Sequence, residues 1–253
     1  MFPSRPQDIF ADIALCLAFY TRLPVPVAGE RDFAAAQWAA PVAGLAVGLI
    51  GGLVLLAADF LGLPETVAAA LAVASTVFVT GALHEDGLSD MADGFGGGKT
   101  RERKLEIMRD SRIGSFGATA LVFSILLRWS AIAAFASPWL AFCAVVASHA
   151  AGRAMMPVFL NAVAPARSDG LSAGAGSVPD STALLACAIA AAVVLLTLGL
   201  NVALVSAIAL VLVFFLMRRL CERQIGGQTG DVLGAVEQAS EITVLLVACA
   251  ILT

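Results

Sequence analysis

Long apolar stretches with almost no charged residues dominate this sequence and restrict the folds that it can adopt. A helix that crosses a bilayer needs about 20 mostly apolar residues. Only 13% of this chain is charged, whereas soluble domains carry about 25%. We therefore expect an all-α, polytopic integral membrane bundle that forms one domain over residues 1–253. About seven transmembrane helices are expected, at 38–58, 64–83, 116–136, 138–160, 182–199, 202–217 and 232–253.

The two ends of the sequence are less regular than these spans. The segment 9–23 contains Asp12 and is followed by Pro24 and Pro26, which predicts a short interfacial or re-entrant helix. Prolines and aspartates interrupt the first residues, so no cleavable signal pattern is expected. Full crossing by the last span is left open, because Glu237 and Glu241 lie in its first half.

The distribution of lysine and arginine predicts an orientation. Basic residues precede the first expected span and occupy every second connection, whereas the other connections contain none. By the positive-inside rule, the N-terminus and the polar segments around 84–115, 161–181 and 218–241 should face the cytoplasm. Arg128 should then face the bundle or a polar cavity, and Arg153 can snorkel from a position near a cytoplasmic end.

An acidic segment, GALHEDGLSDMADGFGGG at 81–98, follows the second expected span. At about 100° per residue, one helix would hold Asp86, Asp90 and Asp93 within an arc of roughly 60°. Carboxylates that share a face repel one another, and a divalent cation removes that repulsion. With Glu85 beside them, these residues predict an Mg²⁺ site, and Asp231 of a later segment is expected to join it. A solvated acidic loop is the alternative.

The glycines and lysine after the acidic segment suit phosphate binding. Gly96, Gly97 and Gly98 can offer backbone N–H groups as an anion nest, although a flexible hinge would have the same sequence. Lys99 can bind phosphate or lipid headgroups, or act only on topology.

A second group follows within the same polar segment. Asp110, Ser111 and Arg112 either complete a metal–phosphate site or form an ion pair at a helix start. Arg109 adds a further positive charge for nucleotide phosphates.

The later polar segments add candidates from distant parts of the sequence. Arg167 and Asp169 precede a Gly-rich stretch that suits a lid or a plain linker. Gln228 precedes Asp231, and Gln238 lies seven residues further on nearly the same helical face. Helix capping is the competing role for Asp231.

Residues near the N-terminal segment and the acidic segment complete the candidate substrate site. Tyr20 and Arg22 can reach it from the N-terminal side. His84 is a second candidate for substrate contact, as a supporting group or a general base. His149 is expected to be a packed core residue.

The motifs together resemble the cobalamin synthase (adenosylcobinamide-GDP ribazoletransferase) family. The resemblance rests on FYTRLPVP at 19–26, HEDGLSDMADGFGGG at 84–98, IMRDSRIGSFGA at 107–118, RSDGLSAG at 167–174 and GGQTGDVLGAVEQASE at 226–241. These motifs span nearly the whole chain in the family's order.

The resemblance implies a reaction and a location. Adenosylcobinamide-GDP and α-ribazole, or its 5′-phosphate, would give adenosylcobalamin, or its 5′-phosphate, and GMP, with Mg²⁺ required. The metal-bound Asp86, Asp90 and Asp93 would act on the diphosphate, and one of them, Asp93 for example, would accept the hydroxyl proton. The resemblance also implies a bacterial inner-membrane enzyme, with a homo-oligomer or association with other corrinoid-pathway enzymes left open. Nucleic acid is not an expected partner.

Two other functions fit parts of the pattern. A CDP-alcohol phosphatidyltransferase also uses spaced aspartates on membrane helices, but the glycines at 96–98 replace its usual continuation. An ion-coupled transporter would place carboxylates near the middle of the membrane, whereas these lie at one edge of a span.

Overall fold

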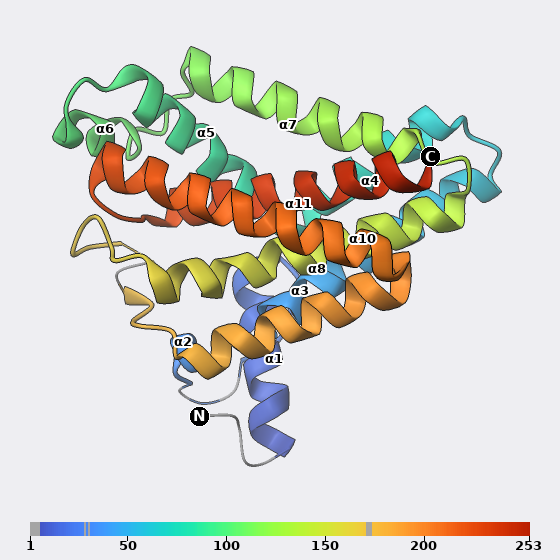
Figure 1. Cartoon of the computed structure of the whole chain (residues 1–253), viewed down its shortest axis with the longest axis horizontal. Helices are drawn as coiled ribbons and strands as arrows, with labels where there is room; N and C mark the ends of the chain where they lie inside the picture. Colours follow the sequence, from blue (N-terminus) through green and yellow to red (C-terminus); the bar gives the residue numbers. More distant parts are fainter. Residues whose placement is uncertain (1–5, 28, 30, 171–173) are drawn as a thin grey trace.

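The computed structural model describes residues 6–27, 29, 31–170 and 174–253, and its regular elements are helices. The all-α expectation is therefore confirmed. The elements are α1 (Pro6–Tyr20), α2 (Phe33–Ala36), η1 (Gln37–Ala39), α3 (Ala40–Phe60), α4 (Glu65–Thr80), α5 (Leu83–Gly97), α6 (Arg101–Ile107), α7 (Ser115–Ala133), α8 (Pro138–Ala162), α10 (Asp180–Ile225) and α11 (Gly230–Leu252). Figure 1 shows the long helices side by side, with α1 projecting from the bundle.

The helix α8 forms the centre of the bundle, and 94% of its most apolar window is buried. Small residues let α3 approach it closely. A Cβ on Gly44 would lie 2.2 Å from the backbone oxygen of His149, and one on Gly48 would lie 2.7 Å from Val146 Cα. Glycine at both positions is therefore required by backbone packing, as is common between membrane helices.

The expected span 64–83 is divided by a sharp bend. α4 ends at Thr80, the glycine and alanine at 81 and 82 have φ angles of 65° and 60°, and α5 leaves at 88° to α4. Glycine adopts this left-handed conformation without strain, whereas Ala82 does so at a cost. The bend turns the acidic helix α5 across the bundle instead of continuing the span.

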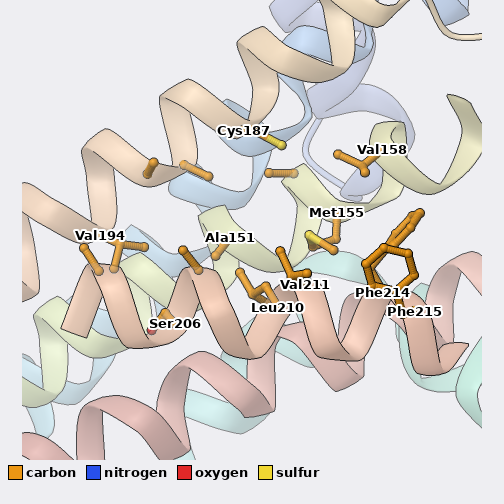
Figure 2. A pocket seen from close by; sticks show the side chains of 15 residues that line it. Ala151, Met155, Val158, Cys187, Val194, Ser206, Leu210, Val211, Phe214 and Phe215 are labelled. Carbon is orange, nitrogen blue, oxygen red and sulfur yellow. The ribbon is translucent and has the colours of Figure 1, made fainter. Parts of the chain in front are cut away.

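The two expected spans 182–199 and 202–217 form one element, α10, that breaks at Gly199 with φ 82° and ψ 174°. In Figure 1 the two orange halves of α10 run back along each other from this break. Figure 2 shows both halves lining one apolar cavity of about 530 Å³ together with Met155 of α8. Cys187 and Ser206 are the only polar side chains in that lining.

Within the described part of the chain, five helices are long and apolar enough to cross a bilayer, or six when α4 and α5 count as one bent span. This count is lower than the seven expected because α10 is counted once, although its halves on either side of the non-helical Gly199 correspond to the expected spans 182–199 and 202–217, and because α4 has only 16 residues. The C-terminal helix α11 is one of the five, although it carries Glu237 and Glu241. Only 17% of the apolar window of α10 is buried, so its outer surface suits contact with lipid.

The N-terminal helix α1 has 15 residues, too few to cross a bilayer, which agrees with the short helix expected at 9–23. Its buried Asp12 accepts hydrogen bonds from Trp38 Nε1 at 2.9 Å and from Arg31 Nη2 at 2.5 Å. These contacts attach α1 to the start of the bundle.

Candidate active site

The acidic helix α5 crosses α11 at two glycines. A Cβ on Gly87 would lie 2.9 Å from the backbone oxygen of Asp231, and one on Gly234 would lie 3.2 Å from Gly87 Cα. Any side chain larger than glycine would separate the helices at this point. The close crossing therefore brings the start of α11 to the acidic face of α5.

This crossing collects three carboxylates from distant parts of the sequence. Asp86 is exposed and Asp90 and Asp231 are partly buried. The negative charges of Asp86, Asp93 and Asp231 all repel the ionised carboxylate of Asp90. Among the described residues, no lysine or arginine forms an ion pair with Asp86 or Asp90. Uncompensated like charges of this kind suit a bound cation.

Two cavities meet at Asp86. One has a volume of about 160 Å³ and is also lined by Tyr20, His84 and Asp231. The other has a volume of about 400 Å³ and is lined by Arg22, which is exposed, and by the bend between α4 and α5. The structure thus brings the predicted residues Tyr20, Arg22, His84, Asp86 and Asp231 together.

Asp93 has a local role that the sequence did not reveal. Its Oδ2 accepts a hydrogen bond from the Gly114 N–H at 2.7 Å, and its Oδ1 accepts one from the Gly117 N–H at 2.8 Å. These donors belong to the N-terminus of α7, where a carboxylate is stabilised by unpaired N–H groups. A Cβ on Gly117 would lie 2.3 Å from Asp93 Oδ2. Asp93 therefore attaches α7 to α5.

The structure distinguishes the two roles considered for Asp231. Thr229 is the N-cap of α11, since its hydroxyl accepts the Val232 N–H at 3.3 Å. Asp231 Oδ2 instead accepts a hydrogen bond from the Thr229 hydroxyl at 3.2 Å. The capping role thus belongs to Thr229, and Asp231 remains available to the carboxylate cluster.

Arg167 faces the same cluster. Its positive charge favours the ionised form of the Asp231 carboxylate. Its Nε and Nη1 are buried without a hydrogen-bond partner among the described residues, and Nε lies 3.9 Å from Asp169 Oδ1. A partly buried guanidinium with unused N–H donors and only a long ion pair to Asp169 is suited to an anionic ligand.

The three polar segments meet at one end of the bundle, on the left in Figure 1. Arg101 of α6 donates hydrogen bonds to the backbone oxygens of Ile225, at 2.8 Å, and Ala166. Gln228 is buried, and its backbone N–H donates to Ala164 O at 2.9 Å. The residues 171–173, within the expected lid, lie outside the described part of the chain.

The anion nest expected at residues 96–98 is not formed. Gly96 and Gly97 belong to α5, and Gly98 is its C-cap with φ −87°. None of the three has the positive φ that favours glycine. A Cβ on Gly96 would lie 2.5 Å from the Phe116 ring, so close packing accounts for that glycine. The helix continues because its N–H groups find partners within the helix.

Exposed charged pairs occupy the surface beside α6. Arg112 Nη2 lies 2.5 Å from Asp110 Oδ2, and hydrogen bonds from Arg112 lower the pKa of Asp110 to about 2. This is the ion pair that was the alternative to a phosphate site. Arg109 Nη2 lies 2.6 Å from Asp169 Oδ2, which connects α6 to the segment around Arg167. Ser111 and Lys99 are exposed.

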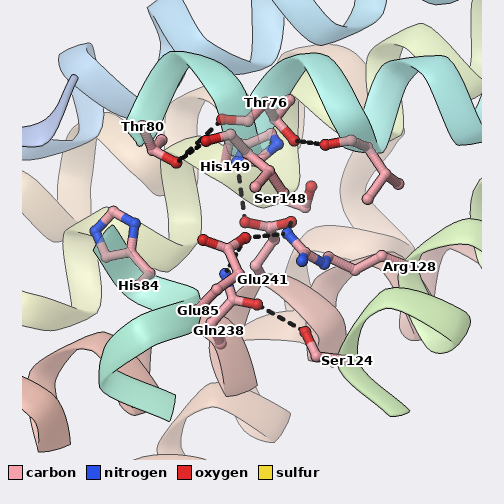
Figure 3. Close-up of polar contacts among 12 residues, drawn as sticks. Thr76, Thr80, His84, Glu85, Ser124, Arg128, Ser148, His149, Gln238 and Glu241 are labelled. Atoms are coloured by element: carbon pink, nitrogen blue, oxygen red, sulfur yellow. Dashed lines mark hydrogen bonds and ion pairs between the residues drawn. The ribbon is translucent and has the colours of Figure 1, made fainter. Parts of the chain in front are cut away.

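A network of buried charged side chains lies between α5, α7, α8 and α11 (Figure 3). Glu85, expected among the metal ligands, points into this network, where its Oε1 lies 2.9 Å from Arg128 Nη1. Gln238, expected at the substrate, donates to Glu237 Oε2 at 3.1 Å and accepts from the Ser124 hydroxyl at 2.7 Å. Both side chains therefore join helices together inside the network, whereas Asp86 is exposed.

The network contains the one group of three His, Cys, Asp or Glu side chains in the described ranges whose ligand atoms all lie within 4.8 Å of one another, namely His149, Glu237 and Glu241. The oxygens of Asp86, Asp90 and Asp231 do not meet this spacing, so a shared ion would require their side chains to turn toward it. These groups already have partners. His149 Nδ1 lies 2.9 Å from Glu241 Oε2, and Arg153 Nη1 lies 2.8 Å from Glu237 Oε1. Two adjacent guanidiniums would repel a divalent cation, so we interpret this cluster as ion pairs.

The prediction that Arg153 snorkels is wrong. Its side chain is 1% exposed, because Glu237 offers a buried partner and the neighbouring helices cover it. Arg128 does face the bundle interior, as expected, and His149 is a hydrogen-bonded core residue, as expected. The sequence analysis missed the network, although Glu237 and Glu241 in α11 and His149 and Arg153 in α8 each show a four-residue spacing within an apolar helix.

The fold and the site define the class: a polytopic helical membrane protein with a carboxylate cluster where two helices cross at one end of the bundle. The sequence matches the cobalamin-5-phosphate synthase family over residues 12–249. The chain belongs to that family, whose members are enzymes.

Similar proteins carry the same name in several bacteria. The chain is 56% identical to the adenosylcobinamide-GDP ribazoletransferase of Mesorhizobium japonicum over 96% of this chain and 94% of that protein. It is 54% identical to the protein of that name in Bradyrhizobium diazoefficiens, over 96% and 95%. Identity to the Azorhizobium caulinodans protein is 47%, over 96% of each chain. No solved structure matches this chain.

Proposed function

We propose that this chain is an Mg²⁺-dependent adenosylcobinamide-GDP ribazoletransferase of the bacterial inner membrane, with its site facing the cytoplasm. Family membership and the printed name of its relatives support the reaction. The single structural observation that carries the proposal is the α5–α11 crossing, which gathers Asp86, Asp90 and Asp231 beside two cavities. The basic residues on the polar connections support the orientation.

The carboxylate cluster fits a magnesium ion. Oxygen ligands from one to three carboxylates, with water and phosphate in the other positions, are its usual environment in proteins. We propose Asp86, Asp90 and Asp231 as the residues that would hold it, since no arginine or lysine among the described residues pairs with the first two. Glu85 and Asp93 are left to position α5 and α7, because their oxygens already have partners. When bound, the ion would neutralise charge on the diphosphate.

The chain's own residues would then direct a substitution at phosphorus. The ribose 3′-hydroxyl of α-ribazole attacks the phosphorus that carries the cobinamide, a new O–P bond forms, and the bond to GMP breaks. Asp86, which borders both cavities, accepts the hydroxyl proton. Arg167 and Arg22 bind the phosphate oxygens and orient them for in-line attack.

Release of GMP tests this function directly. Purified protein in detergent or in vesicles, given adenosylcobinamide-GDP, α-ribazole and Mg²⁺, should release GMP and form the joined corrinoid in equal amounts. Omission of α-ribazole, or addition of a chelator, should abolish release. A CDP-alcohol phosphatidyltransferase would instead release CMP from CDP-diacylglycerol, and a transporter would release no nucleotide. Either of those results, without GMP, would contradict the proposal.

A further inference from the structure

The cavity of about 160 Å³ beneath Asp86 and Asp231 has an unusual composition. Its walls are mostly apolar and aromatic, and its lining includes Phe19, Tyr20, Phe33, Leu83, Met156 and Leu233. The carboxylates lie in the lining at one side, contributed by the crossing of α5 and α11. A ligand that fits it has a flat apolar body and a polar group that reaches the carboxylates.

The aromatic residues of the cavity are held in fixed positions. The Phe19 ring meets the Tyr20 ring edge to face, with centroids 4.9 Å apart, and meets Phe33 at 4.7 Å. The Tyr20 ring stacks on the His84 ring at 6.0 Å with an interplanar angle of 23°. Rings fixed in this way present faces and edges that bind planar heterocycles.

One polar atom in the cavity lining has no partner. His84 is 1% exposed, and its Nε2 is buried without a hydrogen-bond partner among the described residues. Its other ring nitrogen, Nδ1, faces the buried network and lies 3.8 Å from Glu237 Oε2, and in Figure 3 no dashed contact reaches the His84 ring. The Tyr20 hydroxyl is not free in the same way, since it donates to Gln37 Oε1 at 2.5 Å. Apart from the Asp86 and Asp231 carboxylates, the cavity therefore offers one strong hydrogen-bonding position.

We propose that this cavity binds the benzimidazole base of α-ribazole, with His84 Nε2 donating a hydrogen bond to the free ring nitrogen. The inference rests on the proposed transferase function. His84 Nδ1 lies 3.8 Å from Glu237 Oε2, beyond hydrogen-bond distance, and that oxygen already accepts from Gln238 Nε2 at 3.1 Å. A neutral imidazole that carries its proton on Nε2 is therefore assigned as the donor, and the benzimidazole ring offers one acceptor nitrogen. With its base in the cavity, the ribose of α-ribazole lies on the side of Asp86 and Asp231, where its hydroxyl must react.

The guanine base of the other substrate fits this cavity poorly. Guanine carries several donors and acceptors on its edges, and each one buried without a partner weakens binding. The cavity supplies apolar and aromatic walls for most of its surface and a single unpaired imidazole nitrogen, and in this proposal its two carboxylates, Asp86 and Asp231, are taken up by the metal ion and the ribose. The cavity therefore selects a base with few polar groups, and the guanine is placed elsewhere.

Steady-state kinetics with both substrates varied in turn tests the assignment. His84→Leu should raise the KM for α-ribazole about tenfold, as expected for loss of one buried hydrogen bond, and change the KM for adenosylcobinamide-GDP less than about twofold. His84→Gln, which retains an N–H donor on a side chain of similar reach, should recover most of the affinity. A larger change in the KM for adenosylcobinamide-GDP than in that for α-ribazole would overturn the proposal.

A second variant tests the cavity without touching its polar atom. Met156→Trp should fill the space and weaken equilibrium binding of α-ribazole to the purified protein at least about tenfold. The matched control is Leu212→Trp, at a side chain that is 66% exposed on α10, which should bind α-ribazole as the wild type does. Unchanged binding in Met156→Trp would exclude the base from this cavity. GMP release by the wild type is measured separately, so failure of the base site does not count as failure of the reaction.

Discussion

The carboxylates of the acidic helix α5 differ in whether their oxygens already have partners, although three of them share one helical face. Asp93 accepts two backbone hydrogen bonds from the start of α7, and Glu85 pairs with Arg128. Asp86 and Asp90 have no such partner among the described residues. The acidic face thus divides into groups that hold helices together and groups that remain available for a metal ion and substrate.

Replacement of Asp90 by asparagine tests the second group. The variant Asp90→Asn preserves the size of the side chain and removes the charge of the carboxylate that three other carboxylates repel. We expect turnover to fall by at least roughly 10²-fold, the order of loss for a central electrostatic group, with thermal unfolding in detergent little changed. Asp59→Asn, an exposed carboxylate at the end of α3, is the control and should retain activity. Near-normal turnover of Asp90→Asn would remove Asp90 from the site.

Helical periodicity predicted the shared face of Asp86, Asp90 and Asp93, because the spacing alone fixes direction within one helix. The same spacing could not predict that Asp93 meets the N–H groups of Gly114 and Gly117, since that contact depends on how α7 packs. The nest expected at Gly96 failed for a similar reason: α5 continues through it.

Pairs of helices decide where the carboxylates meet. α5 and α11 approach closely at Gly87 and Gly234. A Cβ added to Gly87 would lie 2.9 Å from Asp231 O, and one added to Gly234 would lie 3.2 Å from Gly87 Cα, both shorter than an ordinary van der Waals contact. Nothing in the sequence pattern identified this crossing, because a glycine in a helix is equally compatible with many partners. The bend at Gly81 and Ala82, which aims α5 at α11, was also not predicted.

Gly87→Ala tests the crossing. The new methyl would lie 2.9 Å from Asp231 O and 3.1 Å from Asp231 Cα, both rigid backbone atoms. Overpacking of this kind costs about 1–3 kcal/mol, so we expect a lower unfolding temperature and a loss of turnover as Asp231 moves from Asp86. Gly97→Ala, in the same helix, meets only Ile107 Cδ1 at 3.5 Å and should leave the unfolding temperature unchanged or raise it. Equal stability of the two variants would contradict the close crossing.

The whole molecule places its polar connections at one end and the break of α10 at the other (Figure 1). The sequence predicted the shared end from charge placement, and the contacts of Arg101 with the later connections confirm that these segments meet. The break at Gly199 separates the two expected spans 182–199 and 202–217, whereas hydropathy did not show that the expected span 64–83 bends at Gly81 and Ala82.

Cysteine labelling tests the orientation of this arrangement. In a variant without the five native cysteines, a cysteine at Thr100 should react only with a reagent on the cytoplasmic face. A cysteine at Leu200, whose side chain is 60% exposed beside the α10 break, should react only from outside. Labelling of both positions from one face would contradict the proposed orientation.

The central claim is that Asp90 of α5 and Asp231 of α11 hold the same ion, and a double-mutant cycle on GMP release measures it. Groups that act through one ion lose most of their effect together, so their losses are not additive. We expect Asp90→Asn and Asp231→Asn each to lower turnover and raise the Mg²⁺ concentration for half-maximal activity, and the double variant to be little worse than the poorer single one. Asp180→Asn, in the first turn of α10, is the matched control. Losses that multiply in the double variant, with an unchanged Mg²⁺ midpoint in Asp231→Asn, would contradict the shared site.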